Sequence, residues 1–316
     1  MKNRLLILFF LIFLSSASSQ NESVKSLVDK TKDLNLDMWD LVEFAQKNIK
    51  EDIELARFFY YWIGSNIQYD YEFLRKKREG KYISKELFEK QDEYNVYLNR
   101  KGVCAGYTNL FKWFMDEVDI KSVYISGHIR DERNHYVQLE SDDNFRHAWN
   151  AIKLNDKWMI IDTTWGTSQD SSVSDFYFDM KPEVAIISHF PKERKWQFLE
   201  NPLSLEEFNR SKFIKPIWFF IGFSDIPKLK EDNNNYYFVY RTNPNKKWSV
   251  QLMYSVDNKN FGPIENTTII DQDGFTYIRF NKTQTRRKAF YKVNIYLFKY
   301  YENIEPIYSN IINFKT

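Results

Sequence analysis

The sequence predicts an α+β fold in two domains, with helices and an antiparallel sheet in the first and an all-β, immunoglobulin-like sandwich in the second. Three observations predict it. Apolar residues recur at helical spacing through much of residues 20–100. From Ser122 the spacing changes to the alternation that is typical of strands. From about residue 214, seven short β-prone runs are separated by clusters of Asn, Asp, Gly and Pro.

The length supports two domains, because 316 residues are many for a single core. We expect a signal peptide over residues 1–19, a mixed domain over 20–210 and a β-sandwich domain over 211–316. The β-prone runs of the last part are 218–223, 236–241, 248–255, 267–270, 275–280, 289–299 and 307–314.

The first residues have the pattern of a targeting segment. Lys2 and Arg4 precede an unbroken apolar stretch, Leu5–Leu14, and small residues suited to cleavage follow. The stretch is shorter than the roughly 20 residues that span a bilayer, so we expect no stable membrane insertion. We therefore expect an exported protein, periplasmic or secreted, after cleavage.

The composition limits the classes of partner that we expect this protein to bind. A formal net charge of +2 gives no broad cationic field, so nucleic acid is not an expected partner. Aromatic residues make up 18% of the chain and suit large cores or a groove for an extended polymer. Only one cysteine, Cys104, is present, although exported proteins usually pair their cysteines.

Helical spacing before and around Cys104 is clear. The sets Leu41, Phe44, Ala45 and Leu55, Phe58, Phe59, Trp62, Ile63 each predict a helix, and the charged stretch from Arg75 to Glu93 is expected to be solvated. A further helix is predicted from Cys104 to Val118, with the cysteine in its first turn. There the helix dipole and unpaired N–H groups stabilise a thiolate.

Two strands follow, at 147–154 and 157–162, joined by a turn at Asn155-Asp156. If Leu154 faces Lys157, then Trp149 faces Asp162. His147 is two residues from Trp149 and therefore shares a sheet face with Asp162.

Cys104, His147 and Asp162 are thus the parts of a catalytic triad. The imidazole would take the thiol proton and the carboxylate would orient the ring. The alternative is that Cys104 has no chemical role and is a small buried apolar residue.

Other side chains are assigned to the surroundings of the triad. The Cys104 backbone N–H and either Gln68 or Tyr69 are candidate oxyanion donors. Trp149 and Trp165 are expected to pack around the site or contact substrate.

We expect no metal and no cofactor. The remaining histidines are scattered and form no metal-ligand pattern, and His128 and His135 are expected at the surface. No phosphate-binding or dinucleotide glycine loop is found.

At these residues the sequence resembles the transglutaminase-like superfamily of papain-type folds. The resemblance implies a cysteine-bearing helix packed on an antiparallel sheet, with Cys104 as nucleophile, His147 as base and Asp162 as orienting acid. Within the superfamily, the segment after the core resembles kyphoscoliosis peptidase-like members, in which a β-sandwich commonly follows. The matching pieces are residues 62–70, 102–107, 147–151 and 162–166, and then 182–183, 188–191 and 196–199.

Members of that superfamily cross-link glutamine to lysine, deamidate, cleave peptides or only bind protein. The sequence therefore predicts an exported cysteine acyl-transfer enzyme, of peptidase or transglutaminase/deamidase type, acting on protein or peptide amides. The alternative is a non-catalytic module that binds protein or cell wall and carries a relic triad. The sequence leaves the natural substrate and the oligomeric state open.

Overall fold

The computed structural model describes residues 23–81, 84–131, 139–140, 147–167, 173–245, 247–285, 289–297, 306 and 308–315. The expected signal peptide at 1–19 lies outside them. The described residues fall into two compact units, the first within Met1–Gly127, Phe145–Pro182 and Pro191–Phe198 and the second within His128–Asn144, Glu183–Phe190 and Leu199–Thr316. The domain boundary at 210/211 stays a prediction.

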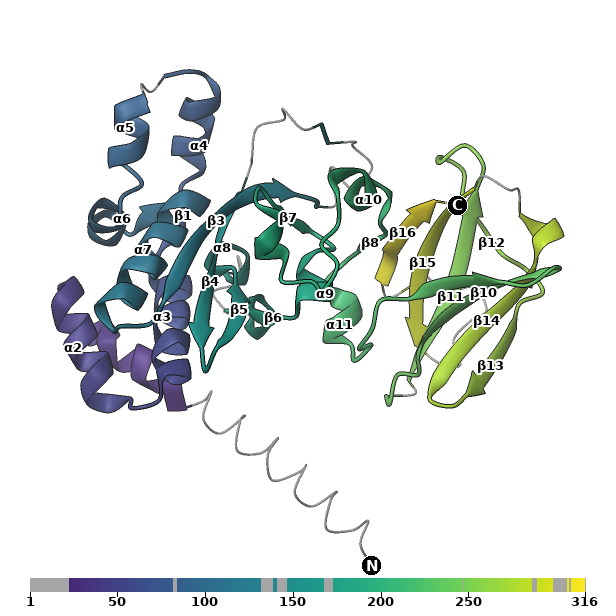
Figure 1. Cartoon of the computed structure of the whole chain (residues 1–316), viewed down its shortest axis with the longest axis horizontal. Coiled ribbons are helices and arrows are strands. Elements are labelled where there is room, and N and C mark those ends of the chain that lie inside the picture. The colour runs from purple at the N-terminus through teal and green to yellow at the C-terminus, as the bar shows by residue number, and fades with distance from the viewer. Residues whose placement is uncertain are drawn as a thin grey trace, which may run out of the picture. The chain divides into compact units, whose positions relative to one another are not determined.

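Helices form one layer of the first unit (Figure 1). An Asp37 capping box starts α2, in which the Asp37 side chain accepts a hydrogen bond from the backbone of Asp40. The charged stretch from Arg75 to Glu93, which we expected to be solvated, includes the end of α4 and all of α5. The helical elements are residues 23–30, η1 (Thr31–Asp33), α2 (Met38–Asn48), α3 (Asp52–Asn66), α4 (Tyr71–Arg78), α5 (Ser84–Glu89), α6 (Glu93–Asn99) and α7 (Cys104–Glu117).

The other layer of the first unit is formed by β6, β5, β4 and most of β3, which belong to a five-stranded sheet in the order β6-β5-β4-β3-β7; His189 and Phe190 of β7 are grouped with the second unit. Antiparallel pairs join β3 to β4, β4 to β5 and β5 to β6. Leu154 pairs with Lys157, so the register predicted from the sequence is confirmed. The strands are β3 (Ser122–Ile129), β4 (His147–Leu154), β5 (Lys157–Ile161), β6 (Phe178–Met180) and β7 (His189–Pro191).

Short elements complete the fold around the sheet. Two-residue strands β1 and β2 pair in parallel, which holds Tyr69 opposite Gly102 just before α7. The short elements are β1 (Gln68–Tyr69), β2 (Lys101–Gly102), α8 (Thr163–Gly166), η2 (Asp175–Tyr177), α9 (Pro182–Ala185), η3 (Arg194–Gln197) and α10 (Leu205–Arg210).

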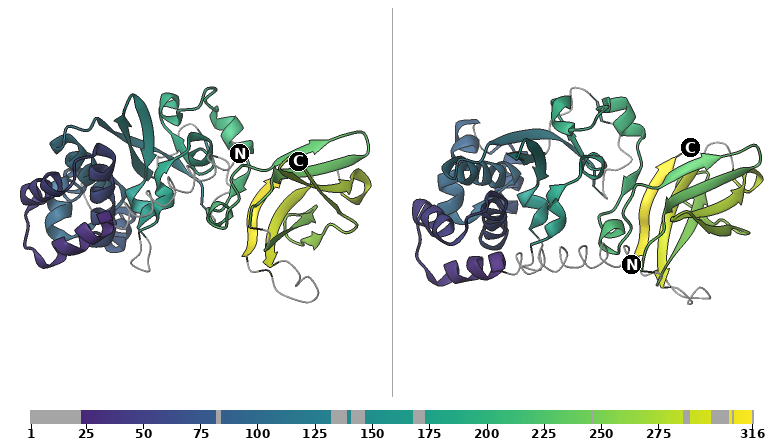
Figure 2. Two further views of the ribbon diagram at one scale, coloured as in Figure 1. Left: turned by 90° about the horizontal axis from the view of Figure 1, so that it is seen from below. Right: turned by 60° about the horizontal axis from the view of Figure 1, so that its bottom comes forward.

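Aromatic side chains of α3 and α7 make the core between the layers. The Phe59 and Phe114 rings stack with centroids 4.4 Å apart, and both side chains are fully buried. The buried Tyr107 hydroxyl donates to the Ile67 carbonyl oxygen at 2.6 Å. In Figure 2 the purple-to-blue helices lie together against the teal sheet. Helix α7, with Cys104 at its start, packs directly on β4.

The second unit contains two further antiparallel sheets, ordered β13-β14-β10-β9 and β12-β11-β15-β16-β8. Side chains from both sheets share one hydrophobic core, including Phe238 and Ile278 from the first and Leu252 and Val293 from the second. The shared core agrees with the predicted β-sandwich. Its immunoglobulin-like topology stays a prediction. The strands are β8 (Phe213–Ile214), β9 (Lys228–Glu231), β10 (Asn235–Arg241), β11 (Trp248–Ser255), β12 (Gly262–Pro263), β13 (Thr268–Gln272), β14 (Phe275–Asn281), β15 (Phe290–Leu297) and β16 (Tyr308–Lys315).

One strand prediction was wrong: the run 218–223 starts inside α11 (Ile217–Phe220) and continues as a turn. Pro216 precedes the helix with a φ of −52°, which suits a helix start. The apolar residues serve packing instead, since the Trp218 ring stacks on Phe223 with centroids 3.8 Å apart. Among the described residues, no helix is long and apolar enough to cross a membrane.

Candidate active site

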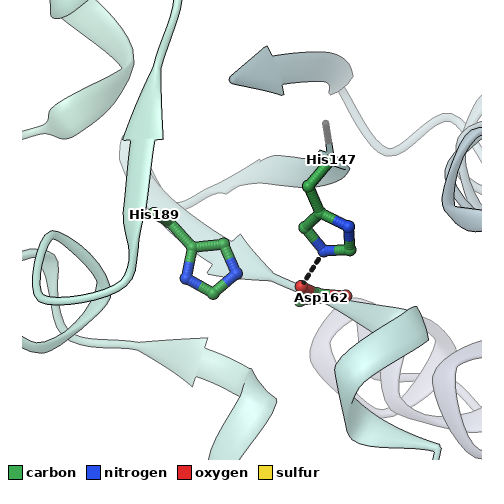
Figure 3. Close-up of side chains that lie close together, drawn as sticks. All are labelled: His147, Asp162 and His189. Carbon is green, nitrogen blue, oxygen red and sulfur yellow. Dashed lines mark hydrogen bonds and ion pairs between the residues drawn. The ribbon is translucent and has the colours of Figure 1, made fainter. Parts of the chain in front are cut away.

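A buried histidine–aspartate pair lies at one end of the β4–β5 hairpin. His147 is the first residue of β4, and Asp162 directly follows β5. Nε2 of His147 is 2.6 Å from Oδ2 of Asp162, and the two side chains are 4% and 0% exposed (Figure 3). The hairpin register produces this contact, because it places both residues on one face of the sheet.

Asp162 is held from two further directions. Its Oδ1 accepts a hydrogen bond from the Trp165 backbone N–H at 2.9 Å, which caps α8. Its own backbone N–H donates to the Tyr177 carbonyl oxygen at 2.9 Å. Both carboxylate oxygens are therefore engaged, and the one facing His147 has a fixed position.

The His147 imidazole favours its charged form. Burial alone would lower its pKa, but the charge and hydrogen bond of Asp162, with a smaller contribution from Cys104, raise the pKa to about 10. Because Nε2 is engaged with Asp162, Nδ1 is the ring nitrogen left for the thiol.

Cys104 is the first residue of α7 and is partly buried. Burial would raise its pKa, yet a hydrogen bond and charge from His147 and a backbone hydrogen bond from Ala148 outweigh that effect, so the pKa of the thiol is lowered. A lowered cysteine pKa at a helix start is the setting in which thiolates form.

Two buried amides that the sequence analysis missed hold the helix that carries Cys104. Gln91 Oε1 accepts a hydrogen bond from the Val103 backbone N–H at 2.8 Å, immediately before the cysteine. Asn150 Nδ2 donates to the Thr108 carbonyl oxygen at 3.1 Å and so links β4 to α7. Local sequence offers no signal for either contact, since Gln91 lies in the charged stretch and yet is 6% exposed.

The two proposed oxyanion residues differ in their surroundings. Tyr69 is partly buried, and burial followed by the charge of Cys104 raises its pKa well above the ordinary value. Its hydroxyl therefore keeps its proton. Gln68 is exposed.

Aromatic rings surround His147. The Trp149 ring lies 6.0 Å and the Trp165 ring 5.3 Å from the imidazole, centroid to centroid. Trp149 is 2% exposed, which fits packing rather than substrate contact. Tyr124, which the sequence analysis did not single out, is 40% exposed on β3, and burial of its hydroxyl end and the charge of Cys104 raise its pKa to about 12.

The remaining histidines are not part of this pair. His128 was expected at the surface, and this is wrong: it is 2% exposed, because β3 continues through Ile129. His135 lies outside the described residues. His189, also drawn in Figure 3, belongs to the second unit, where its Nδ1 is 2.8 Å from the Ser188 hydroxyl.

The hydrogen bond between His147 and Asp162 suits transfer of a proton between the thiol and the imidazole.

Cys104 lies at the start of a helix, and the hydrogen-bonded His147–Asp162 pair lies on an antiparallel sheet. Residues 41–163, which include all three side chains, match the family model described as "Transglutaminase-like superfamily". This segment of the chain belongs to that superfamily.

Several curated proteins are similar to part of this chain. Mouse "Kyphoscoliosis peptidase" is 30% identical over 184 residues, which cover 56% of this chain and 26% of the mouse protein. "Lim and transglutaminase domain protein ltd-1" of Caenorhabditis elegans is 24% identical over 209 residues, covering 61% and 27% of the two chains. The chain thus spans about a quarter of the length of these relatives.

Solved structures also match in part. "Crystal structure of a TGase" has 15% sequence identity and a TM-score of 0.30, covering 48% of this chain and 33% of its own. A structure described as a putative cysteine protease from Cytophaga hutchinsonii has 19% identity and a TM-score of 0.27, covering 42% and 39%.

Proposed function

We propose that this chain is an exported cysteine acyl-transfer enzyme that acts on protein or peptide amides through a thioester at Cys104. The observation that carries the proposal is the position of His147, which is hydrogen bonded to buried Asp162 and lowers the pKa of the Cys104 thiol. The peptidase and the transglutaminase or deamidase forms share every step up to the thioester.

The chemistry follows from the three side chains. Nδ1 of His147 takes the thiol proton, and the thiolate attacks the amide carbonyl carbon. The imidazolium then gives that proton to the leaving nitrogen as the C–N bond breaks. A water molecule or an amine attacks the thioester and regenerates the thiol, and Asp162 keeps the ring oriented throughout.

We assign the oxyanion to the Cys104 backbone N–H and the Tyr69 hydroxyl. The N–H points out of the first turn of α7, where it has no partner within the helix. Tyr69 keeps its proton and interacts electrostatically with Cys104, whereas Gln68 is exposed. Two donors at the site of developing negative charge are what such a reaction needs.

Export rests on the sequence alone. The basic Lys2 and Arg4 before the apolar stretch Leu5–Leu14 are typical of a signal peptide. Amino-terminal sequencing of the mature protein should find a first residue close to position 20, and an intact Met1 would contradict export.

The pH dependence of iodoacetamide labelling at Cys104 tests the catalytic proposal. Labelling that is rapid at about pH 6 and is abolished by His147→Ala would support an activated thiolate. A second variant, Trp149→Phe, keeps the packing beside His147 and is the matched control for disturbance of the fold. Labelling that only rises at about pH 8 to 9, equally in all forms, would contradict the proposal and favour a binding module with a relic triad.

A further inference from the structure

The first unit contains a cavity at the opposite end of the β4–β5 hairpin from the histidine–aspartate pair. It has a volume of about 760 Å³ and is bounded by the turn after Leu154, the start of α3 and β6. His147 and Leu154 are the two ends of β4, so the cavity lies roughly 23 Å along the strand from the site at a rise of about 3.3 Å per residue. The triad proposal makes no use of this cavity.

Charges of both signs line the cavity in equal number. Among the described residues, no salt bridge joins two of these charged groups to each other. A cavity whose lining charges are not paired with each other can bind a ligand that carries both charges, because each end of the ligand then meets a group of opposite charge. The cations are Lys50, Arg57 and Lys157, and the acids are Glu51, Asp52 and Asp179.

Asp179 has an unusual backbone conformation. Its φ is +62°, and it lies in β6 where the pairing with β5 shifts register between Ile160 and Ile161. Such β-bulges redirect a side chain, and non-glycine residues adopt positive φ uncommonly. Asparagine and aspartate tolerate this conformation better than other residues, so the backbone can be preserved when the charge is removed.

Arg57 is held in place by its surroundings. Its guanidinium lies over the Phe178 ring, 4.2 Å from the centroid, and its Nε is 3.4 Å from Glu54 Oε2. The side chain is 17% exposed. The guanidinium also hydrogen bonds with the Tyr61 side chain. Because a guanidinium has five N–H donors, these contacts leave donors for a carboxylate in the cavity.

We propose that this cavity binds a short peptide with free ends, its carboxylate at Arg57 and its ammonium group at Asp179. Trp158 and Met159, which also line the cavity, supply apolar surface for a side chain. This inference goes beyond the proposed acyl transfer, because it assigns a second binding site with its own ligand chemistry.

Isothermal titration of the full chain with the dipeptide alanyl-leucine tests the proposal. We expect saturable binding that is unchanged in Cys104→Ala, since the ligand would not occupy the thiol site. N-acetylation or C-amidation of the dipeptide should each weaken binding at least tenfold. Absence of saturation at about 10 mM dipeptide would overturn the proposal.

Matched variants assign the two ends. Asp179→Asn should weaken binding of the free dipeptide at least tenfold and leave binding of the N-acetyl form unchanged. Arg57→Met, which keeps packing on Phe178, should also weaken binding of the free dipeptide at least tenfold. It should leave binding of the C-amidated dipeptide unchanged. The control is Asp156→Asn, since Asp156 also has a positive φ, +62°, but does not line the cavity. Equal affinities in Asp179→Asn and Asp156→Asn would overturn the assignment.

Discussion

The charge on His147 couples the candidate site to folding. Its pKa in the folded chain is about 10, above the ordinary value of 6.5, because Asp162 outweighs the effect of burial. A group whose folded pKa is raised stabilises the fold fully below pH 6.5. That contribution is lost progressively as the pH rises from there through about 10.

We therefore expect the difference in unfolding free energy between wild type and His147→Gln to shrink as the pH rises. At about pH 6 the difference should be on the order of a few kcal/mol, and near pH 10 most of it should be gone. Urea denaturation at a series of pH values measures it. A difference that is constant over this interval would mean that His147 is neutral in the folded chain.

Tyr69 allows a separate test of the oxyanion assignment. Tyr69→Phe removes only the hydroxyl and should slow acylation of Cys104 by p-nitrophenyl acetate by about 100-fold. Labelling by iodoacetamide forms no oxyanion and should keep its rate. Gln68→Ala should change neither reaction, so equal losses in the two variants would refute the role of Tyr69.

Contacts of single residues can be predicted from the sequence where their chemistry or the strand register constrains them. The contact between His147 and Asp162 was predictable, because one hairpin turn sets which residues share a face. Gln91 and Asn150 were not predictable, because their partners Val103 and Thr108 are chosen by tertiary packing across 12 and 42 residues of sequence.

Helix α7 depends on a close approach at Gly106. A Cβ there would lie 2.6 Å from Gln91 Oε1 and 2.7 Å from Val96 Cγ2. Gln91 is the side chain that accepts a hydrogen bond from Val103 ahead of the cysteine. Crowding at Gly106 would therefore displace Gln91 and disturb the backbone that positions the Cys104 thiol.

Gly106→Ala should destabilise the chain by about 1–3 kcal/mol, although alanine normally favours a helix by about 1 kcal/mol over glycine. It should also slow labelling of Cys104 at mildly acidic pH. Urea denaturation and iodoacetamide labelling provide the two readouts. The control is Gly262→Ala, where a Cβ would meet nothing within 4 Å. A Gly106→Ala variant as stable as this control would show that Gln91 and Val96 can move aside.

Elements with one strong periodicity were predicted well, and short apolar runs were not. The predicted strand 275–280 falls within β14 (Phe275–Asn281), in which half-buried and buried positions alternate from Phe275 to Phe280. The run 218–223 shows no alternation of apolar and polar residues. Pro216 just before it and the burial of Trp218 favour a helical turn instead.

Each unit has a large hydrophobic core of its own. The first unit's cluster includes Phe59, Tyr107 and Phe114, and the second unit's cluster includes Trp218 and Tyr291. No residue belongs to both clusters. Each unit therefore buries its own apolar surface, which is the requirement for independent folding.

We expect a substitution in one core to leave the other unit folded. Trp218 is fully buried, so Trp218→Ala should destabilise the second unit by about 3–5 kcal/mol. Phe114→Ala, in the first unit, should destabilise that unit by a similar amount.

Urea denaturation followed by the accessibility of Cys104 reports on the first unit, and total tryptophan fluorescence reports on both. Trp218→Ala should shift only part of the fluorescence transition and leave the Cys104 transition in place, whereas Phe114→Ala should move the Cys104 transition. If Trp218→Ala shifts both transitions together, the two units fold as one cooperative body and the separation of the cores has no thermodynamic counterpart.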